Sequence, residues 1–182
     1  AFAIRSDYKL FGWGYNTYGG LGLGDTTSRS SPTIIGSSSW TSVSAGTGNT
    51  LAIRSDKTLW SWGQNGYGEL GLGNTTAYSS PVQVGTSSWT AVSISSGTNN
   101  SVLAIRYGGS LFAWGDNTYG QACQTGYTDV SWPTIIPGSW RAISNSVDGY
   151  HFIALKSDYS MWSWGSNNYG QLGLGDQTDR SS

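Results

Sequence analysis

Four copies of one short sequence pattern, about fifty residues apart, constrain the fold of this chain more than any other feature. Each copy is an apolar stretch that ends in Trp-Gly and is soon followed by Asn-x-Tyr-Gly. The tryptophans of these pairs are Trp13, Trp62, Trp114 and Trp164, at intervals of 49 to 52 residues. Three copies continue into Leu-Gly-Leu-Gly. Self-similarity at this period is typical of stacked or radial repeat architectures.

The residues before each Trp-Gly pair alternate with a period of two, which predicts strands rather than helices. Trp60 and Trp62 are two positions apart and therefore share one face of a strand. The same pairing occurs at Phe11/Trp13, Phe112/Trp114 and Trp162/Trp164. We expect these aromatic pairs to be buried between adjacent sheets. The predicted structural core of the repeats is Trp13, Trp60, Trp62, Trp114, Trp162 and Trp164.

A second strand precedes each aromatic strand. Residues 51–54 read Leu-Ala-Ile-Arg, and the polar residues 56–58 separate them from the strand that contains Trp60. A spacer of this length and polarity is typical of a hairpin turn. The two strands are therefore predicted to be antiparallel, and each unit offers about four short strands.

The order of these motifs, with Leu-Ala-Ile-Arg-Ser-Asp closing the unit, resembles the regulator of chromosome condensation repeat family over nearly the whole chain. This resemblance implies an all-β fold, a β-propeller of four-stranded repeats that usually has seven blades. About three and a half repeats are present, so we expect residues 1–182 to be part of a larger propeller. The predicted units are 7–55, 56–106, 107–157 and 158–182, with 1–6 as the end of a preceding unit. The alternatives are a complete four-bladed ring with a gap, a pairing with a second copy, or a linear solenoid.

Charge and composition argue against several partners. The formal net charge is −1, and the nine Lys and Arg residues are scattered, so a nucleic-acid partner is not expected. No apolar run has the eighteen or so residues that a membrane-spanning helix needs, so we expect no membrane insertion. The single cysteine, Cys123, excludes an internal disulfide and a multi-cysteine metal site. We predict no metal and no cofactor.

The residues that most often carry catalysis occupy ordinary repeat positions. The only histidine, His151, aligns with Asn49 and Ser101, and Cys123 aligns with glycines of the sister copies. Asp25, Asn74 and Asp176 recur in register, which predicts side-chain caps on a turn. No nucleophile and base, and no pair of carboxylates, is brought together by the pattern. The chain is therefore predicted not to be an enzyme.

The third copy departs most from the pattern, between Gln121 and Trp132. Fold positions solve the same packing problem in every copy, whereas recognition positions are free to differ. Exposed aromatic residues near a loop are typical binding anchors. The candidate binding residues are Tyr127, Asp129 and Trp132, with Asn99 and Asn100 in a second loop that carries a small insertion.

These observations favour a non-enzymatic scaffold for protein binding or assembly. The partner would be an unidentified protein, further copies of the chain, or the rest of its own propeller. One alternative is a structural part of a virion appendage, cell-surface fibre or adhesin, since the copies are rich in Ser, Thr, Gly and Asn and poor in Lys; this composition favours an extracellular or virion setting. The family resemblance also implies exchange factors for small GTPases, but the long hairpin insertion and charge cluster of that class are absent from the sequence.

Overall fold

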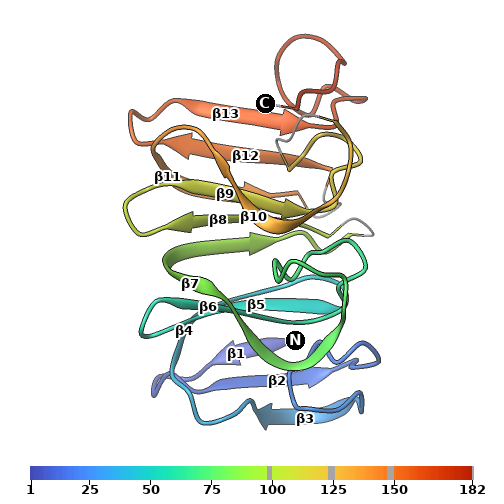
Figure 1. The fold of residues 1–182 in the computed structure, drawn as a ribbon, viewed down its shortest axis with the longest axis vertical. Helices are drawn as coiled ribbons and strands as arrows, with labels where there is room; N and C mark the ends of the chain where they lie inside the picture. Colours follow the sequence, from blue (N-terminus) through green and yellow to red (C-terminus); the bar gives the residue numbers. More distant parts are fainter. Residues whose placement is uncertain (98–99, 123–125, 147–149, 182) are drawn as a thin grey trace.

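A computed structural model describes residues 1–97, 100–122, 126–146 and 150–181 of the chain, and every regular element in them is a strand. The strands form antiparallel sheets that follow one another along the long axis of the molecule (Figure 1). They are β1 (Phe2–Ile4), β2 (Leu10–Gly14), β3 (Arg29–Ile34), β4 (Trp40–Ala45), β5 (Asn49–Arg54), β6 (Thr58–Gly63), β7 (Tyr78–Ile94), β8 (Ser101–Arg106), β9 (Leu111–Gly115), β10 (Val130–Ile136), β11 (Trp140–Asn145), β12 (His151–Lys156) and β13 (Met161–Gly165).

The strands group into four blades. Strands β1 to β3 form the first blade, and β11 to β13 form the fourth. Strands β4, β5 and β6 form the second with the beginning of the long strand β7, whose residues 78–88 pair with β6. The end of β7, residues 89–94, pairs with β8 and so begins the third blade, which β9 and β10 complete. Strand β7 therefore joins two blades.

The blades are out of phase with the sequence units. Unit 56–106, for example, supplies β6 and the first part of β7 to one blade, and the second part of β7 and β8 to the next. Each pair of neighbouring blades is thus linked by a covalently continuous unit. The β5–β6 pair is an antiparallel hairpin, as predicted, with the Thr58 amide donating to Asp56 Oδ1 at 3.0 Å in its turn.

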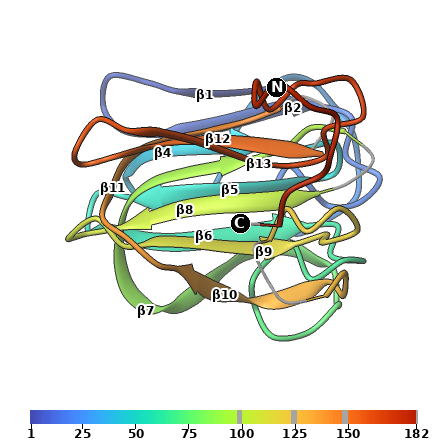
Figure 2. The same cartoon turned by 90° about the horizontal axis from the view of Figure 1, so that it is seen from above.

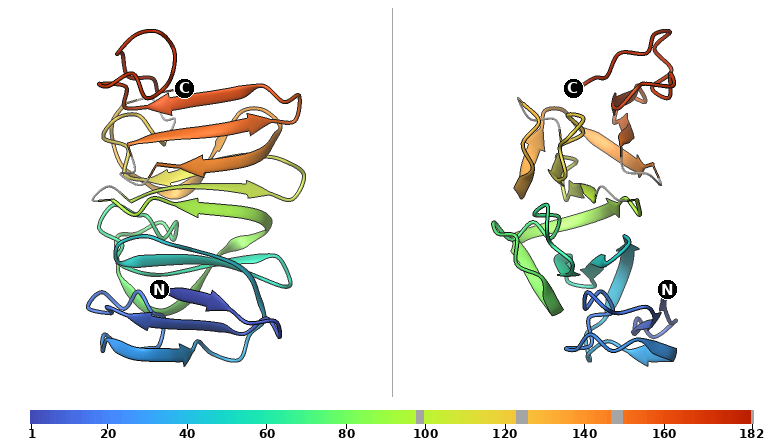
Figure 3. Two further views of the ribbon diagram at one scale, coloured as in Figure 1. Left: turned by 180° about the vertical axis from the view of Figure 1, so that it is seen from behind. Right: turned by 90° about the vertical axis from the view of Figure 1, so that its right-hand side faces the viewer.

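The blades meet along their inner strands. The Ile94 amide of β7 donates to Ser44 Oγ of β4 at 3.0 Å, and Asn145 Nδ2 of β11 donates to the Ser93 carbonyl at 2.9 Å. Seen from above, the blades overlie one another (Figure 2), and seen from behind, their strands follow one another along the long axis (Figure 3). The first and fourth blades lie at opposite ends of the molecule (Figure 1). The described blades therefore do not close into the four-bladed ring that the sequence left open.

A buried tryptophan fills each seam between blades. Trp62, Trp114 and Trp164 are 0%, 0% and 3% exposed. Their indole N–H groups donate across the seam to the carbonyl oxygens of the preceding blade, which belong to Gly20 (2.8 Å), Glu69 (2.9 Å) and Gln121 (2.8 Å). Each indole also meets a second tryptophan of its own blade edge to face, with ring centroids 5.8 to 6.1 Å apart. The prediction that these three tryptophans lie buried between sheets is confirmed.

The other members of the aromatic pairs are less buried than predicted. Trp60 is half-buried beneath the Arg54 guanidinium, 3.5 Å from its ring centroid, and Trp162 is 45% exposed beneath the Lys156 ammonium, at 3.7 Å. Trp13 is also only half-buried. The physical reason differs between them. Trp13 belongs to the first blade, whose outer face no described blade covers. Trp60 and Trp162 are each covered by a cationic side chain, which leaves part of the indole in solvent.

At the first two seams a glycine of the preceding blade lies against the buried tryptophan, Gly22 against Trp62 and Gly71 against Trp114. A Cβ on Gly71, whose φ is +70°, would lie 2.8 Å from Trp114 Nε1, whereas a Cβ on Gly85, at φ +57°, would meet nothing within 4 Å. Both substitutions by alanine carry the strain of a left-handed backbone. We predict that Gly71→Ala lowers the free energy of unfolding by about 1–3 kcal/mol more than Gly85→Ala, because only the former displaces an indole.

Denaturant unfolding followed by tryptophan fluorescence measures this difference. Gly66→Ala is the second control, because its Cβ would also meet nothing and its backbone is not left-handed. Equal destabilisation by Gly71→Ala and Gly85→Ala would show that the seam does not exclude a side chain.

Candidate recognition surface

The segment that departs from the repeat pattern lies at the start of β10, and its two aromatic side chains face solvent. Tyr127 is 69% exposed and Trp132 is 62% exposed. The sister residues of Trp132 are small, Ser31 and Ser80. Two large aromatic side chains are thus displayed where the neighbouring repeats display small or polar ones, which is the arrangement of a protein-binding anchor.

The backbone of this segment is held in the same way as in its sisters. Asn117 Nδ2 donates to the carbonyl oxygens of Gly126 (3.1 Å) and Thr128 (3.2 Å), and its Oδ1 accepts from the Ala122 amide (2.9 Å). The equivalent Asn16 and Asn65 make the same three bonds at the same sequence separations. Asn167 makes two of them, to the Asp176 carbonyl and from the Leu172 amide. We call these hydrogen bonds from the asparagine side chain to the loop backbone the clamp. The third repeat has therefore changed the side chains of its loop and kept the clamp.

Asp129 has a structural partner within this clamp. Its Oδ1 accepts the Asn117 amide at 3.1 Å, as Asp179 accepts the Asn167 amide at 2.6 Å in the fourth repeat. Burial raises the pKa of the Asp129 carboxyl, and repulsion from Asp116 adds to the rise, while the bond from Asn117 opposes it. The predicted caps Asp25, Asn74 and Asp176 are found in the same loops, each accepting a backbone amide two residues on.

Trp132 lies on the loop of the preceding blade. A Cβ on Gly73 would overlap the Trp132 ring, so the indole rests directly on the glycine backbone. At the seam between the first and second blades, the sister residue Ser80 takes the place of Trp132. Its Oγ atom lies 3.5 Å from the position that a Cβ on Gly24 would occupy. The same repeat position therefore contacts the preceding blade at both seams. Its side chain is a serine at the earlier seam and a tryptophan at the later one.

Trp132 also walls a groove at the outer rim of this seam. The groove has a volume of about 170 Å³, and its lining includes Trp89, Arg106, Phe112 and Pro133. The Arg106 guanidinium lies 5.1 Å from the Phe112 ring centroid and donates to Ser87 Oγ. The equivalent groove of the preceding seam, which has Ser80 in place of Trp132, measures about 340 Å³. The groove thus combines a cation with aromatic walls, and Trp132 narrows it.

The second predicted loop is different. Asn99 lies outside the described residues, as does Cys123. Asn100 is only 2% exposed, and its Nδ2 lies 3.5 Å from Glu69 Oε1. The expectation that Asn100 contributes to an exposed recognition loop is therefore wrong, because its side chain is turned inward to a carboxylate.

Sequence reasoning missed Glu69 itself. Its side chain is fully buried, and it accepts the Tyr67 amide at Oε2 (2.7 Å) and Asn49 Nδ2 at Oε1 (3.2 Å). Burial raises the pKa of the Glu69 carboxyl, and these hydrogen bonds oppose the rise. The signal was present in the alignment of the repeats, because the equivalent positions hold Gly20, Gln121 and Gln171 and only this copy holds an acid.

In the described ranges, no three His, Cys, Asp or Glu side chains gather as a metal cluster, and no helix could span a membrane.

The sequence matches the "Regulator of chromosome condensation (RCC1) repeat" at residues 8–53, 56–104 and 160–182. A second description of the same repeat matches residues 40–69 and 91–121. A comparison with curated proteins finds no significant match.

Several solved structures have a similar fold. Human WBSCR16 aligns with a TM-score of 0.85 at 20% identity, over 99% of this chain and 48% of that one. Yeast RCC1 (Prp20), solved with Kap60 bound to it, aligns with a TM-score of 0.82 at 17% identity, over 99% and 45%. Prp20p of Saccharomyces cerevisiae, reported with its binding properties to Gsp1p and histones, aligns with a TM-score of 0.77 at 18% identity, over 95% and 45%. The chain spans about half the length of these structures.

The geometry at Asp129 predicts different effects for two substitutions. Asp129→Asn keeps an oxygen that accepts the Asn117 amide and removes a charge that burial disfavours, so we expect an unchanged or slightly higher free energy of unfolding at pH 7. Asp129→Ala removes the acceptor and should cost about 1 kcal/mol, as the loss of other side-chain caps does. Chemical denaturation of both variants measures the difference. Equal destabilisation would show that the charge, and not the cap, holds the loop.

Proposed function

This chain belongs to the regulator of chromosome condensation (RCC1) repeat family, and we propose that it is a non-enzymatic β-propeller scaffold that binds a protein partner through the outer rim of its third repeat. Residues 1–182, in units 7–55, 56–106, 107–157 and 158–182, form part of a larger propeller in this proposal. The span of about half of each matched structure is consistent with that arrangement.

The observation that carries the proposal is that the Trp132 indole is exposed to solvent and at the same time packed against the backbone of the preceding blade. Its indole rests on the Gly73 backbone yet keeps 62% of its surface in solvent. A pre-positioned aromatic loses little conformational entropy when a partner covers it, and such residues dominate the energy of protein interfaces. Since a serine serves the sister seam, packing alone does not require an indole here.

The groove beside Trp132 indicates what the partner offers. Arg106 supplies guanidinium donors, and Trp89, Phe112 and Pro133 supply apolar walls. A protein segment with an apolar side chain and a neighbouring carbonyl or carboxylate group matches this lining. The groove is small for a drug-sized ligand, which favours a protein segment. Yeast proteins of this fold are described with protein partners, Kap60 in one case and Gsp1p and histones in another, and this supports the class of partner rather than its identity.

We predict that Trp132→Ser and Tyr127→Ala each weaken partner binding by about 30-fold, the effect of losing an anchor worth about 2 kcal/mol. Trp132→Ser should change the free energy of unfolding by less than about 1 kcal/mol, because the indole is mostly exposed and serine occupies the sister site. A protein captured by the immobilised chain is identified, and its affinity for each variant is measured by surface plasmon resonance beside thermal unfolding.

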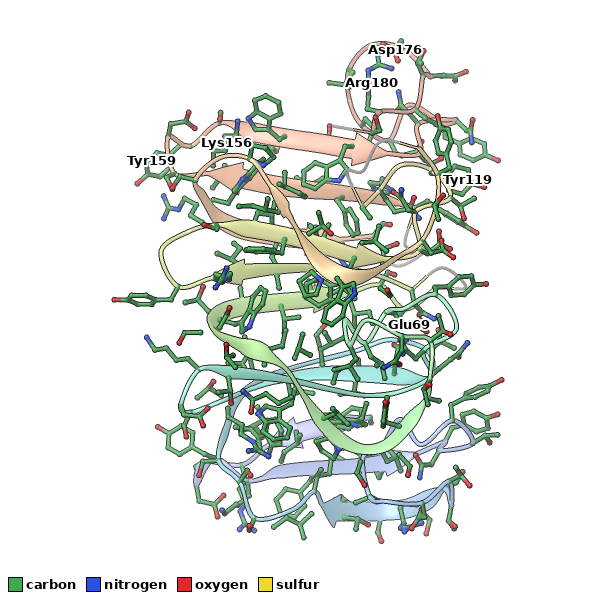
Figure 4. All side chains as sticks on the ribbon, in the orientation of Figure 1. Glu69, Tyr119, Lys156, Tyr159, Asp176 and Arg180 are labelled. Atoms are coloured by element: carbon green, nitrogen blue, oxygen red, sulfur yellow. The ribbon has the colours of Figure 1, made fainter. Side chains whose placement is uncertain are left out.

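Tyr159→Ala is the matched control. Tyr159 is 72% exposed, and it lies in the turn between β12 and β13, at the far end of the strands from the repeat loops (Figure 4). It should not change affinity. A partner that binds the Trp132 and Tyr127 variants as tightly as the native chain would contradict the proposed surface. Lost stability with unchanged binding would show that Trp132 only packs the seam.

A further inference from the structure

The buried carboxylate of Glu69 lies between the second and third blades, and no positively charged side chain of the described residues forms an ion pair with it. The groups that influence its pKa are neutral: the backbone amides of residues 67 and 69 and the side-chain amides of Asn49 and Asn100. Figure 4 shows Glu69 among the loops at one end of the strands. Burying an unpaired carboxylate is costly, so a counter-ion or a proton is expected beside it.

The two asparagines that face Glu69 have unmatched oxygens. Asn49 is 1% exposed and Asn100 is 2% exposed, and the Oδ1 atom of each is buried without a hydrogen-bond partner. Both oxygens lie close to the position that a Cβ on Gly46 would occupy. The Ser95 carbonyl oxygen lies close to the same position. Turning either amide over would exchange its nitrogen and oxygen and bring the oxygen beside the carboxylate. In either orientation each amide oxygen lies beside another acceptor oxygen, which belongs to Ser95 in one case and to Glu69 in the other.

The separations in the cluster match those between ligands of one cation. The amide nitrogen positions of Asn49 and Asn100 lie 3.2 and 3.5 Å from Glu69 Oε1. With the amides turned over, these become distances between oxygens. Oxygens that bind one ion at about 2.3–2.6 Å, at right angles to each other, lie about 3.3–3.7 Å apart. The amide N–H groups released by the turn would point to the side where the Ser95 carbonyl lies.

A cavity between the first and second blades reaches one member of this cluster, Asn49. It has a volume of about 160 Å³ and is lined by Gly46, Gly48 and Asn49 on one side and by Tyr15 and Tyr18 on the other. Tyr18 is 48% exposed and Tyr15 is 66% exposed.

We infer that Glu69, Asn49 and Asn100 form a binding site for a hard cation such as Ca²⁺, Na⁺ or K⁺, which joins the second and third blades. Carboxylate, amide and carbonyl oxygens are the ligands that such cations select. The site is distinct from the surface around Trp132 and does not rest on the proposed function.

Thermal unfolding in the presence of different cations tests the site. The protein is freed of metal ions in choline chloride and then receives CaCl₂, NaCl or KCl at constant ionic strength. We expect Tm to rise saturably with at least one of these salts, by about 5 °C or more at a cation concentration of about 100 Kd. Isothermal titration calorimetry with the same salt measures Kd directly.

Glu69→Gln is the matched variant, because the sister residue Gln121 makes the same bond to a backbone amide, that of Tyr119, at 2.7 Å. It should fold and lose the response to the cation. Asn49→Ser, which introduces the residue of the aligned position 101, should lower the affinity at least tenfold and serves as a second variant. Equal responses of the native protein and Glu69→Gln would overturn the inference.

A proton is the rival occupant, and acidification distinguishes it. If the cations leave Tm unchanged and the native protein gains stability relative to Glu69→Gln as the pH is lowered from 7 to 5, Glu69 is neutralised by a proton and the cation site is refuted.

Discussion

The fold depends on one contact that recurs at every described seam, the indole N–H of a buried tryptophan bonded to a carbonyl of the preceding blade. Trp62, Trp114 and Trp164 each make it. The bond sets how closely neighbouring blades approach, and the ring fills the space between them, so the facing loop has room only for glycine at positions such as Gly22 and Gly71. Apolar burial supplies most of the energy of the seam, and the hydrogen bond fixes its register.

A second recurring feature makes the backbone conformation of each loop independent of the identity of its outward side chains. In the first three repeats the asparagine of Asn-x-Tyr-Gly binds the backbone of the loop at three points. This includes the third repeat, where Asn117 holds a loop of different sequence. The clamp leaves the outward residues free to vary without loss of the loop geometry. Tyr127 and Trp132 use this freedom, whereas Asp129 is part of the clamp itself.

Residue 69 connects the seam with the buried cluster. Its carbonyl accepts the Trp114 indole, while its carboxylate accepts amide groups from Asn49 of the second blade and Asn100 beside the third. An ion at this point would tighten a contact that already joins the blades. The same position holds glutamine in the third and fourth repeats, so any such effect would belong to a single seam of an otherwise regular array.

The sequence alone determined the elements whose cause is local. Alternation with a period of two placed the strands, the polar residues 56–58 placed a hairpin, and recurring Asp and Asn residues marked turn caps, because these depend on near neighbours along the chain. Exposure of Tyr127 and Trp132 also agreed with the pattern of repeat differences. Only the tertiary structure decided the phase of the blades, the exposure of Trp162, the burial of Asn100 and the unmatched charge of Glu69. Each of these depends on which blade packs against the residue. The sequence pattern of a single repeat does not specify which residues of another blade lie beside it.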